Sequence, residues 1–209
     1  AASNATVTRN ETIRWQAEEG FWLLHEHLER LAASAEYFAI PFHREKLRSV
    51  LEDAVAGKQY HEARIRVRLS PDGAVHTEVS PYEATAAPWR LRPAADSIDS
   101  SNRFLYHKTT HRAPYLQARE SARDCEDVLL WNENGHVTET TVANVVARIN
   151  GELVTPPASC GLLAGTYRAR LLREGTVSER RIHLSELDAA SELYLINSLR
   201  GWIPARMVG

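Results

Sequence analysis

The 209-residue chain has no long apolar run, few cysteines and little net charge, and each of these absences excludes a class of protein. No stretch approaches the roughly 20 apolar residues that cross a bilayer, and the first residues lack the apolar centre of a signal peptide. The net charge of -2 gives no sign of binding to nucleic acid or to a membrane surface. The two cysteines, Cys125 and Cys160, show no metal-ligand spacing, so we expect reduced thiols in a cytoplasmic protein without a bound metal.

What the chain does have is a 44% hydrophobic content, enough for the core of one large domain or two small ones. Apolar residues at three- and four-residue steps predict helices, and alternation or short apolar runs predict strands. The predicted helices are 24–38, 47–55, 114–123 and 166–174, and the predicted strands are 64–69, 75–79, 127–131, 142–149, 152–155 and 193–196. This mixture predicts a mixed α/β (α+β) fold with many hairpins.

The segment of residues 81–102 is the best candidate for a domain boundary. It carries Pro81, Pro88 and Pro93, followed by a polar run. We therefore expect a small N-terminal α/β domain over residues 1–95 and a larger C-terminal domain over residues 96–209, which would contain Lys108.

Residues 106–112 place Lys108 just ahead of a predicted helix. A lysine becomes a reactive amine when burial or nearby positive charge penalises its ammonium form. Such an amine can bond covalently to a carbonyl compound or to pyridoxal phosphate. Most lysines are solvated surface charges, so the meaning of Lys108 depends on the other candidate residues.

A glycine-bounded loop at residues 161–168 opens a predicted helix. The free amides and the dipole of a helix start favour a phosphate, and Thr166 and Tyr167, which follow Gly165, could add hydroxyl donors. The alternative is an ordinary capped helix. The loop is not a P-loop, because the lysine and the glycine spacing of that motif are absent.

Three polar sites elsewhere each have a functional and an ordinary interpretation. Arg30 lies off the apolar stripe of its helix, either as a phosphate ligand or as a solvated surface charge. Glu139 precedes a strand and could keep the ring nitrogen of pyridoxal phosphate protonated, or be an exposed turn residue. In the polar cluster at 197–202, Ser198 could bind phosphate and Arg200 a substrate carboxylate, or the cluster is a plain loop.

The order of these residues matches the pattern of the class IV (fold type IV) aminotransferase-like enzymes, and the chain resembles this family over nearly its whole length. The matching segments are 11–14, 27–34, 106–112, 138–144, 161–168 and 195–204. Within the family, residues 107–110, 128–133 and 197–202 resemble the 4-amino-4-deoxychorismate lyases, including lyase portions fused to para-aminobenzoate synthase component I. Branched-chain aminotransferases carry a tyrosine five residues after the lysine, where this chain has Ala113.

The resemblance implies a two-domain fold, pyridoxal 5'-phosphate as cofactor, and a homodimer that binds neither nucleic acid nor membrane. It implies that Lys108 is joined covalently to the cofactor and that Glu139 faces the pyridine nitrogen. The residues implied to hold the phosphate, or to form the loop around it, are Arg30, Gly165, Thr166, Tyr167 and Ser198.

The implied activity is elimination of pyruvate from 4-amino-4-deoxychorismate to give 4-aminobenzoate, a step of the folate pathway. Arg66, Arg14 and Arg200 are candidates to bind the two substrate carboxylates, and Arg66 is preferred because its strand follows the helix that bears Arg30. One alternative is an aminotransferase of the same fold that acts on a branched-chain or D-amino acid. A second alternative is a binding protein that kept the fold and lost catalysis.

Overall fold

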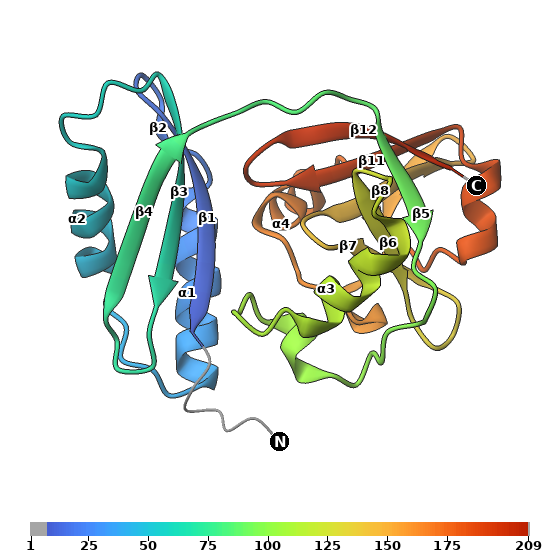
Figure 1. Ribbon diagram of the computed structural model, residues 1–209, viewed down its shortest axis with the longest axis horizontal. Coiled ribbons are helices and arrows are strands. Elements are labelled where there is room, and N and C mark those ends of the chain that lie inside the picture. Colours follow the sequence, from blue (N-terminus) through green and yellow to red (C-terminus); the bar gives the residue numbers. More distant parts are fainter. Residues whose placement is uncertain (1–7, 209) are drawn as a thin grey trace. The chain divides into compact units, whose positions relative to one another are not determined.

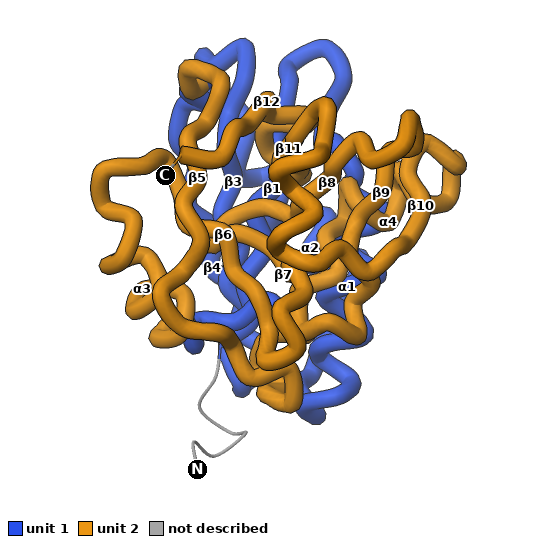
Figure 2. Tube along the Cα trace, turned by 90° about the vertical axis from the view of Figure 1, so that its right-hand side faces the viewer, with its two compact units in different colours: residues 1–84, 107–111 blue, residues 85–106, 112–209 orange. Residues whose placement is uncertain are grey.

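The computed structural model describes residues 8–208 of the chain (Figure 1). They form two compact units, which Figure 2 shows in separate colours. The first unit contains the chain up to Ala84 together with His107–His111, and the second contains Thr85–Tyr106 and the chain from Arg112 onward.

The first unit is an antiparallel sheet covered by two helices. Its elements are β1 (Arg9–Gln16), β2 (Gly20–Phe21), α1 (Leu24–Tyr37), α2 (Arg44–Val55), β3 (Glu62–Leu69) and β4 (Val75–Pro81). The strand order is β2-β1-β3-β4, with α1 against β1 and α2 against β4. Because side chains alternate along a strand, the buried Ile13, Ile65 and Val67 line one face of the sheet and the arginines of β3 line the other.

The segment that bears Lys108 is attached to the edge of this sheet. The amide of Asn10 donates to the carbonyl of Lys108 at 2.9 Å, and the amide of Thr110 donates to the carbonyl of Thr8 at 3.1 Å. Arg9 and Thr109 form an antiparallel bridge between these two bonds. The lysine segment therefore belongs with the first unit, whereas the sequence had placed it in the second.

The second unit is built on a large sheet. Its elements are β5 (Trp89–Pro93), η2 (Arg103–Tyr106), α3 (Ala113–Arg119), η3 (Glu120–Ala122), β6 (Asp127–Trp131), β7 (Val137–Thr140), β8 (Asn144–Ile149), β9 (Glu152–Thr155), η4 (Ala158–Cys160), α4 (Thr166–Arg173), β10 (Ser178–Glu179), η5 (Leu184–Ala189), β11 (Glu192–Asn197) and β12 (Gly201–Met207). The strand order is β10-β9-β8-β11-β12-β5-β6-β7, and β7 also pairs with β8. Six strands thus close on themselves around a core that includes Leu91, Leu129 and Val145.

The sequence predicted a boundary between residues 95 and 96, whereas the observed boundary lies between Ala84 and Thr85. Strand β5 lies inside the proline-rich segment, yet it pairs in parallel with β12 and with β6. The chain therefore enters the second unit at Thr85. Strand β5 was not predicted from the sequence because its partners lie more than 30 residues away in the chain.

Two further observations concern the length of the helices and the state of the cysteines. No helix among residues 8–208 is both long and apolar enough to cross a membrane. Cys125 and Cys160 are free thiols, and both are buried.

Candidate active site

In the first unit, a buried carboxylate on β1 holds two side chains of α1. Glu11 has an exposed fraction of 2%. Arg30 donates to it through Nε at 2.8 Å and through Nη2 at 2.5 Å, and Nδ1 of His27 lies 2.6 Å from Oε2. Arg30 is thus not a solvated surface charge, because Glu11 fixes the orientation of its guanidinium group.

The charges of this cluster determine which groups are ionised. Burial by itself would raise the pKa of Glu11, but Arg30 and His27 together lower that pKa to about 2. Burial lowers the pKa of His27; Glu11 opposes this shift, and the positive charges of Arg30 and Lys108 add to it. At neutral pH we therefore expect an ionised Glu11 and a neutral His27, with the charge of Lys108 acting on this cluster.

Arg66 and Arg14, two of the three arginines predicted to bind substrate, lie on the same face of the sheet in the first unit. Arg66 is paired across the strands with Thr12, and Arg14 with Arg64, so both side chains lie on the face opposite Ile13 and Ile65. Arg14 binds Glu62 through two hydrogen bonds of 2.9 and 3.0 Å. The nearest Arg66–Glu78 contact is 3.9 Å, and both side chains are exposed to solvent. Arg66 is therefore the less firmly held of the two.

In the second unit, Glu139 on β7 is a buried carboxylate with an exposed fraction of 5%. Its Oε1 accepts a hydrogen bond from the hydroxyl of Tyr115 at 2.8 Å and another from the amide of Leu163 at 3.2 Å. Burial, followed by the charge of Glu139, raises the pKa of Tyr115, so this hydroxyl stays protonated and acts as a donor. These contacts exclude the interpretation of Glu139 as an exposed turn residue.

Asn144 connects Glu139 to the glycine-bounded loop. It faces Glu139 across the β7–β8 pair. Its Nδ2 donates to the carbonyl of Leu163 at 2.8 Å, and its Oδ1 accepts from the amide of Gly165 at 3.2 Å. A Cβ atom on Gly165 would lie 2.2 Å from this Oδ1, so a side chain here would displace the amide of Asn144 from the loop. The sequence did not reveal that Asn144 holds this loop beside Glu139, although Asn144 stands in the segment that carries Glu139.

The loop leads into α4, whose first residue is Thr166. Thr166 has an exposed fraction of 3%, and its Oγ1 has no hydrogen-bond partner within residues 8–208. The first amides of a helix also lack partners within the helix, and the helix dipole favours an anion at this end. A buried, unpaired hydroxyl beside these amides suits a phosphate group.

Tyr167 lies differently from what the sequence suggested. Its ring packs against the cluster that contains Leu171 and Ile196, and its hydroxyl is hydrogen-bonded with the indole of Trp202. Tyr167 therefore offers a phosphate its backbone amide rather than its hydroxyl.

Ser198 and Arg200 lie in the turn between β11 and β12. Asn197 holds this turn, because its Oδ1 accepts from the amides of Leu199 and Arg200 at 3.0 and 2.8 Å. Its Nδ2 donates to the carbonyl of Val142 at 3.3 Å, which links the turn to the one that comes after β7. The role of Asn197 was not predicted, although an Asn that caps its own turn is a signal that the sequence contains.

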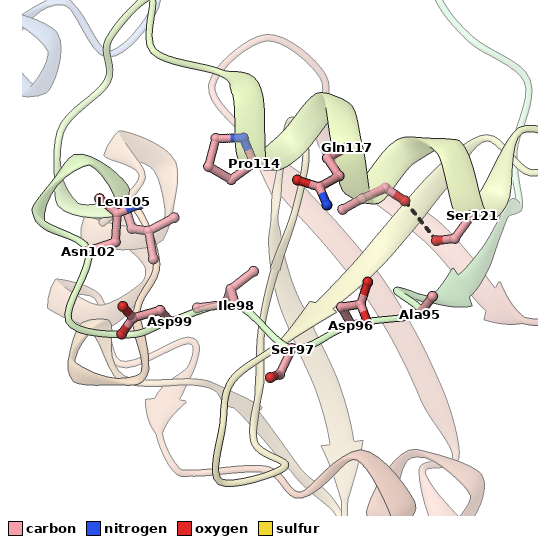
Figure 3. A pocket seen from close by; sticks show the side chains of 11 residues that line it. Ala95, Asp96, Ser97, Ile98, Asp99, Asn102, Leu105, Pro114, Gln117 and Ser121 are labelled. Carbon is pink, nitrogen blue, oxygen red and sulfur yellow. Dashed lines mark hydrogen bonds between the residues drawn. The ribbon is translucent and has the colours of Figure 1, made fainter. Parts of the chain in front are cut away.

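The second unit also contains a cavity of about 250 Å³ between residues 95–102 and α3 (Figure 3). Its lining mixes carboxylate, amide, hydroxyl and apolar side chains. None of the predicted site residues lines it. We assign it no role in the reaction.

The residues present suit pyridoxal phosphate in both of its binding requirements. Glu139 is a buried carboxylate for a protonated ring nitrogen, and Thr166 offers an unpaired hydroxyl at a helix start for the phosphate.

The comparison that decides the family is with the model described as "Amino-transferase class IV", which matches residues 10–208. The chain belongs to the class IV aminotransferase family. It is 34% identical over 200 residues to the "Putative aminodeoxychorismate lyase" of Schizosaccharomyces pombe, covering 91% of this chain and 85% of that protein. It is 31% identical over 208 residues to the "Probable branched-chain-amino-acid aminotransferase" of Thermotoga maritima, covering 94% of this chain and 75% of that protein.

Among solved structures, a "Putative amino-acid aminotransferase" from Mesorhizobium loti matches with a TM-score of 0.91 and 38% identity, covering 97% of this chain and 100% of that one. The predicted mixed α/β fold of the class IV family is confirmed. As a member of this family, the protein is a pyridoxal-phosphate-dependent enzyme, either a lyase or an aminotransferase.

Proposed function

We propose that this class IV enzyme is a 4-amino-4-deoxychorismate lyase, which releases pyruvate and forms 4-aminobenzoate. The observation that carries the proposal is the position of the tyrosine on α3. Five residues after Lys108, where branched-chain aminotransferases carry a tyrosine, stands Ala113. The tyrosine of α3 is Tyr115, and its hydroxyl is bonded to Glu139. The similarity to the lyase of Schizosaccharomyces pombe supports the same conclusion.

We propose Lys108 as the residue that carries the cofactor. The sequence contains only three lysines, and the other two, Lys46 and Lys58, are exposed at α2 and just beyond its end. Bound there, pyridoxal phosphate supplies a conjugated ring that accepts the electron pair left when a proton leaves the carbon next to the substrate nitrogen.

The remaining roles derive from the chemistry of each side chain. Glu139 holds a proton on the pyridine nitrogen, because a buried carboxylate stabilises a cationic ring nitrogen. Arg30, Thr166 and Ser198 bind the phosphate, together with the amides that come after Gly165. Glu11 orients Arg30 for this task.

Lys108 has a second role in this proposal, as the base that removes the proton from C4 of the substrate. The enolpyruvyl group at C3 then leaves as an enolate with the electron pair of its C–O bond. A proton added at its methylene carbon, such as the one that Lys108 took from C4, converts it to pyruvate. The six-membered ring becomes aromatic, which makes the elimination strongly downhill, so no second amino acceptor is needed.

Arg66, Arg14 and Arg200 are the proposed ligands of the two substrate carboxylates. We prefer Arg66, because its contact with Glu78 is long and exposed, and a weak surface ion pair is readily exchanged for a ligand. Arg14 would first have to release Glu62. Arg200 lies 5.6 Å from the ring centre of Trp89, on the turn that holds Ser198.

The similarity to a branched-chain aminotransferase favours a second candidate function, transfer of an amino group from a branched-chain or D-amino acid. Both reactions begin with loss of a proton next to the substrate nitrogen. They differ in their products, because the lyase expels a leaving group from the substrate, whereas an aminotransferase would release a keto acid.

The test is to incubate the purified holoenzyme with 4-amino-4-deoxychorismate and to measure 4-aminobenzoate and pyruvate. We expect both products in equal amounts from the wild-type protein and from Lys46→Ala, and neither from Lys108→Ala. A keto acid formed from branched-chain or D-amino acids, without 4-aminobenzoate, would establish the aminotransferase instead. A Lys108→Ala protein that keeps the covalently bound cofactor would refute the assignment of Lys108.

We also propose that the enzyme works as a homodimer in the cytoplasm. The two free, buried thiols support a reducing compartment. Sedimentation of the holoenzyme tests the assembly, and a monomer at micromolar concentration with full activity would contradict it.

A further inference from the structure

We propose that Tyr115 is a positioning residue for the cofactor's ring nitrogen, because its hydroxyl orients Glu139 and supports the ionised form of that carboxylate. This inference rests on the proposed role of Glu139. Tyr115 is assigned no contact with the substrate.

The first step of the argument is the geometry around Glu139. Tyr115 and Leu163 both donate to the same oxygen, Oε1, at 2.8 and 3.2 Å. Two donors on one oxygen restrict the rotation of the carboxylate and so hold Glu139 in one orientation. In a buried site, hydrogen bonds to a carboxylate replace part of the hydration that the ion has lost.

The second step is that Tyr115 is itself held in place. Its ring packs against the cluster formed by residues such as Ala122, Val128 and Leu130. The guanidinium group of Arg112 lies 4.9 Å from the ring centre and donates to the carbonyl of Thr141 at 2.6 Å. The start of α3 is thus tied to the turn that comes after Glu139, so the hydroxyl has one defined position.

The third step concerns the balance of a shared proton. A proton between a carboxylate and a pyridine nitrogen lies on the nitrogen only while the carboxylate is the weaker base. A hydrogen bond from Tyr115 stabilises the charged carboxylate and lowers its basicity. Removing the hydroxyl makes Glu139 more basic and moves the proton toward it, and the ring then accepts electrons less well.

The experiment uses holoenzyme loaded with pyridoxal phosphate that carries ¹⁵N in the ring, since the ¹⁵N chemical shift reports whether this nitrogen is protonated. We expect Tyr115→Phe to move the signal toward that of the neutral nitrogen and to lower kcat roughly tenfold, with a smaller change in KM. Cofactor affinity, measured by fluorescence titration of the apoprotein, should fall by less than kcat does.

The matched control is Tyr194→Phe, which removes a tyrosine hydroxyl that is also bonded to a carboxylate, that of Glu192 on the same strand. This variant should leave both the ¹⁵N signal and kcat unchanged. A shared loss in both variants would mean that general destabilisation is the cause, and it would overturn the proposal.

A third variant, Glu139→Gln, separates this inference from the proposed role of Glu139. If Glu139→Gln leaves the ring nitrogen protonated, the proposed role of Glu139 is wrong. If Glu139→Gln removes the proton and Tyr115→Phe does not, Glu139 keeps its role, and the inference about Tyr115 is wrong.

Discussion

Glu11 in the first unit and Glu139 in the second are both buried carboxylates, and the contacts described for them differ in kind. Glu11 in the first unit is held by the guanidinium of Arg30 and by His27. Glu139 in the second unit accepts hydrogen bonds from two neutral groups, the hydroxyl of Tyr115 and the amide of Leu163.

This difference determines what each carboxylate can do. A cation cancels the charge of its partner, so the charge of Glu11 is used within the protein to orient Arg30. The hydrogen bonds from Tyr115 and Leu163 orient the carboxylate of Glu139 and add no charge of their own, which suits the role proposed for it toward a cationic ring nitrogen. The comparison teaches that burial alone does not tell what a carboxylate does, because Glu11 and Glu139 are both buried but have different hydrogen-bond donors.

The largest effect should come from removing the structural carboxylate. Glu11→Ala leaves Arg30 and His27 without their acceptor, and breaking a buried ion pair costs about 3–5 kcal/mol. We expect this loss in the free energy of unfolding, measured by denaturant titration. Glu29→Ala is the control, because Glu29 and Arg44 form an exposed ion pair, and such pairs contribute little to stability. Equal losses in the two variants would contradict the structural role of Glu11.

Glu139, the carboxylate proposed to act on the cofactor, should show the opposite profile. We expect Glu139→Gln to lower kcat roughly 100- to 1,000-fold, the range found when one electrostatic contact of a transition state is removed. Its stability should change little, because the amide keeps an oxygen for Tyr115 and Leu163. Kinetics and denaturant titration of the same preparation give both values. A variant with lost stability and unchanged kcat would reverse the comparison.

Low pH should destabilise the protein partly because Glu11 becomes protonated. The folded pKa of Glu11, about 2, is below its ordinary value of 4.5. The stabilisation is therefore complete above about pH 4.5 and is lost as the pH falls toward 2, with a total of about 3 kcal/mol. His27, whose pKa burial lowers, adds a loss of the same sign below its ordinary value of 6.5. Glu11→Gln should flatten this part of the stability profile, and an unchanged acid profile in that variant would contradict the assignment.

Some elements of the fold could be predicted from the sequence, and others could not. Local periodicity was sufficient for α1, α2 and the β3–β4 hairpin, because their patterns repeat within a few residues. Strand β5 was missed, since its partners β12 and β6 lie far away in the chain. Strand β12 was also missed, although it forms a hairpin with the preceding β11.

In the candidate site, too, some features could be predicted from the sequence and others could not. The resemblance located Arg30, Glu139 and Thr166 in the sequence, and the structure places each of them in a buried or half-buried position. The contacts that hold Glu139 could not be predicted, because Tyr115 and Leu163 each lie 24 residues from it, on opposite sides in the chain. The attachment of Lys108 to β1 was likewise hidden, since it depends on backbone pairing and not on side-chain type.

The smallest predicted effect is a change in stability on replacing Arg9, a buried cation at the start of β1. It is fully buried, and its three guanidinium nitrogens have no hydrogen-bond partner among the residues that the structure describes. The guanidinium carbon lies 3.3 Å from the ring centre of Phe38, and burial lowers the pKa of Arg9 to about 10.

A buried charge without an anionic partner costs more than it contributes, and replacing buried ions by apolar groups is often stabilising. We expect Arg9→Leu to raise the free energy of unfolding by about 1 kcal/mol and Tm by about 2–4 °C. The exposed Arg68→Leu is the control, and it should change stability by less than about 0.5 kcal/mol. If Arg9→Leu lowers Tm while Arg68→Leu does not, the stacking of Arg9 on Phe38 outweighs the desolvation of its charge. The first unit would then stabilise a buried cation by aromatic contact, as it stabilises Glu11 by cationic contact.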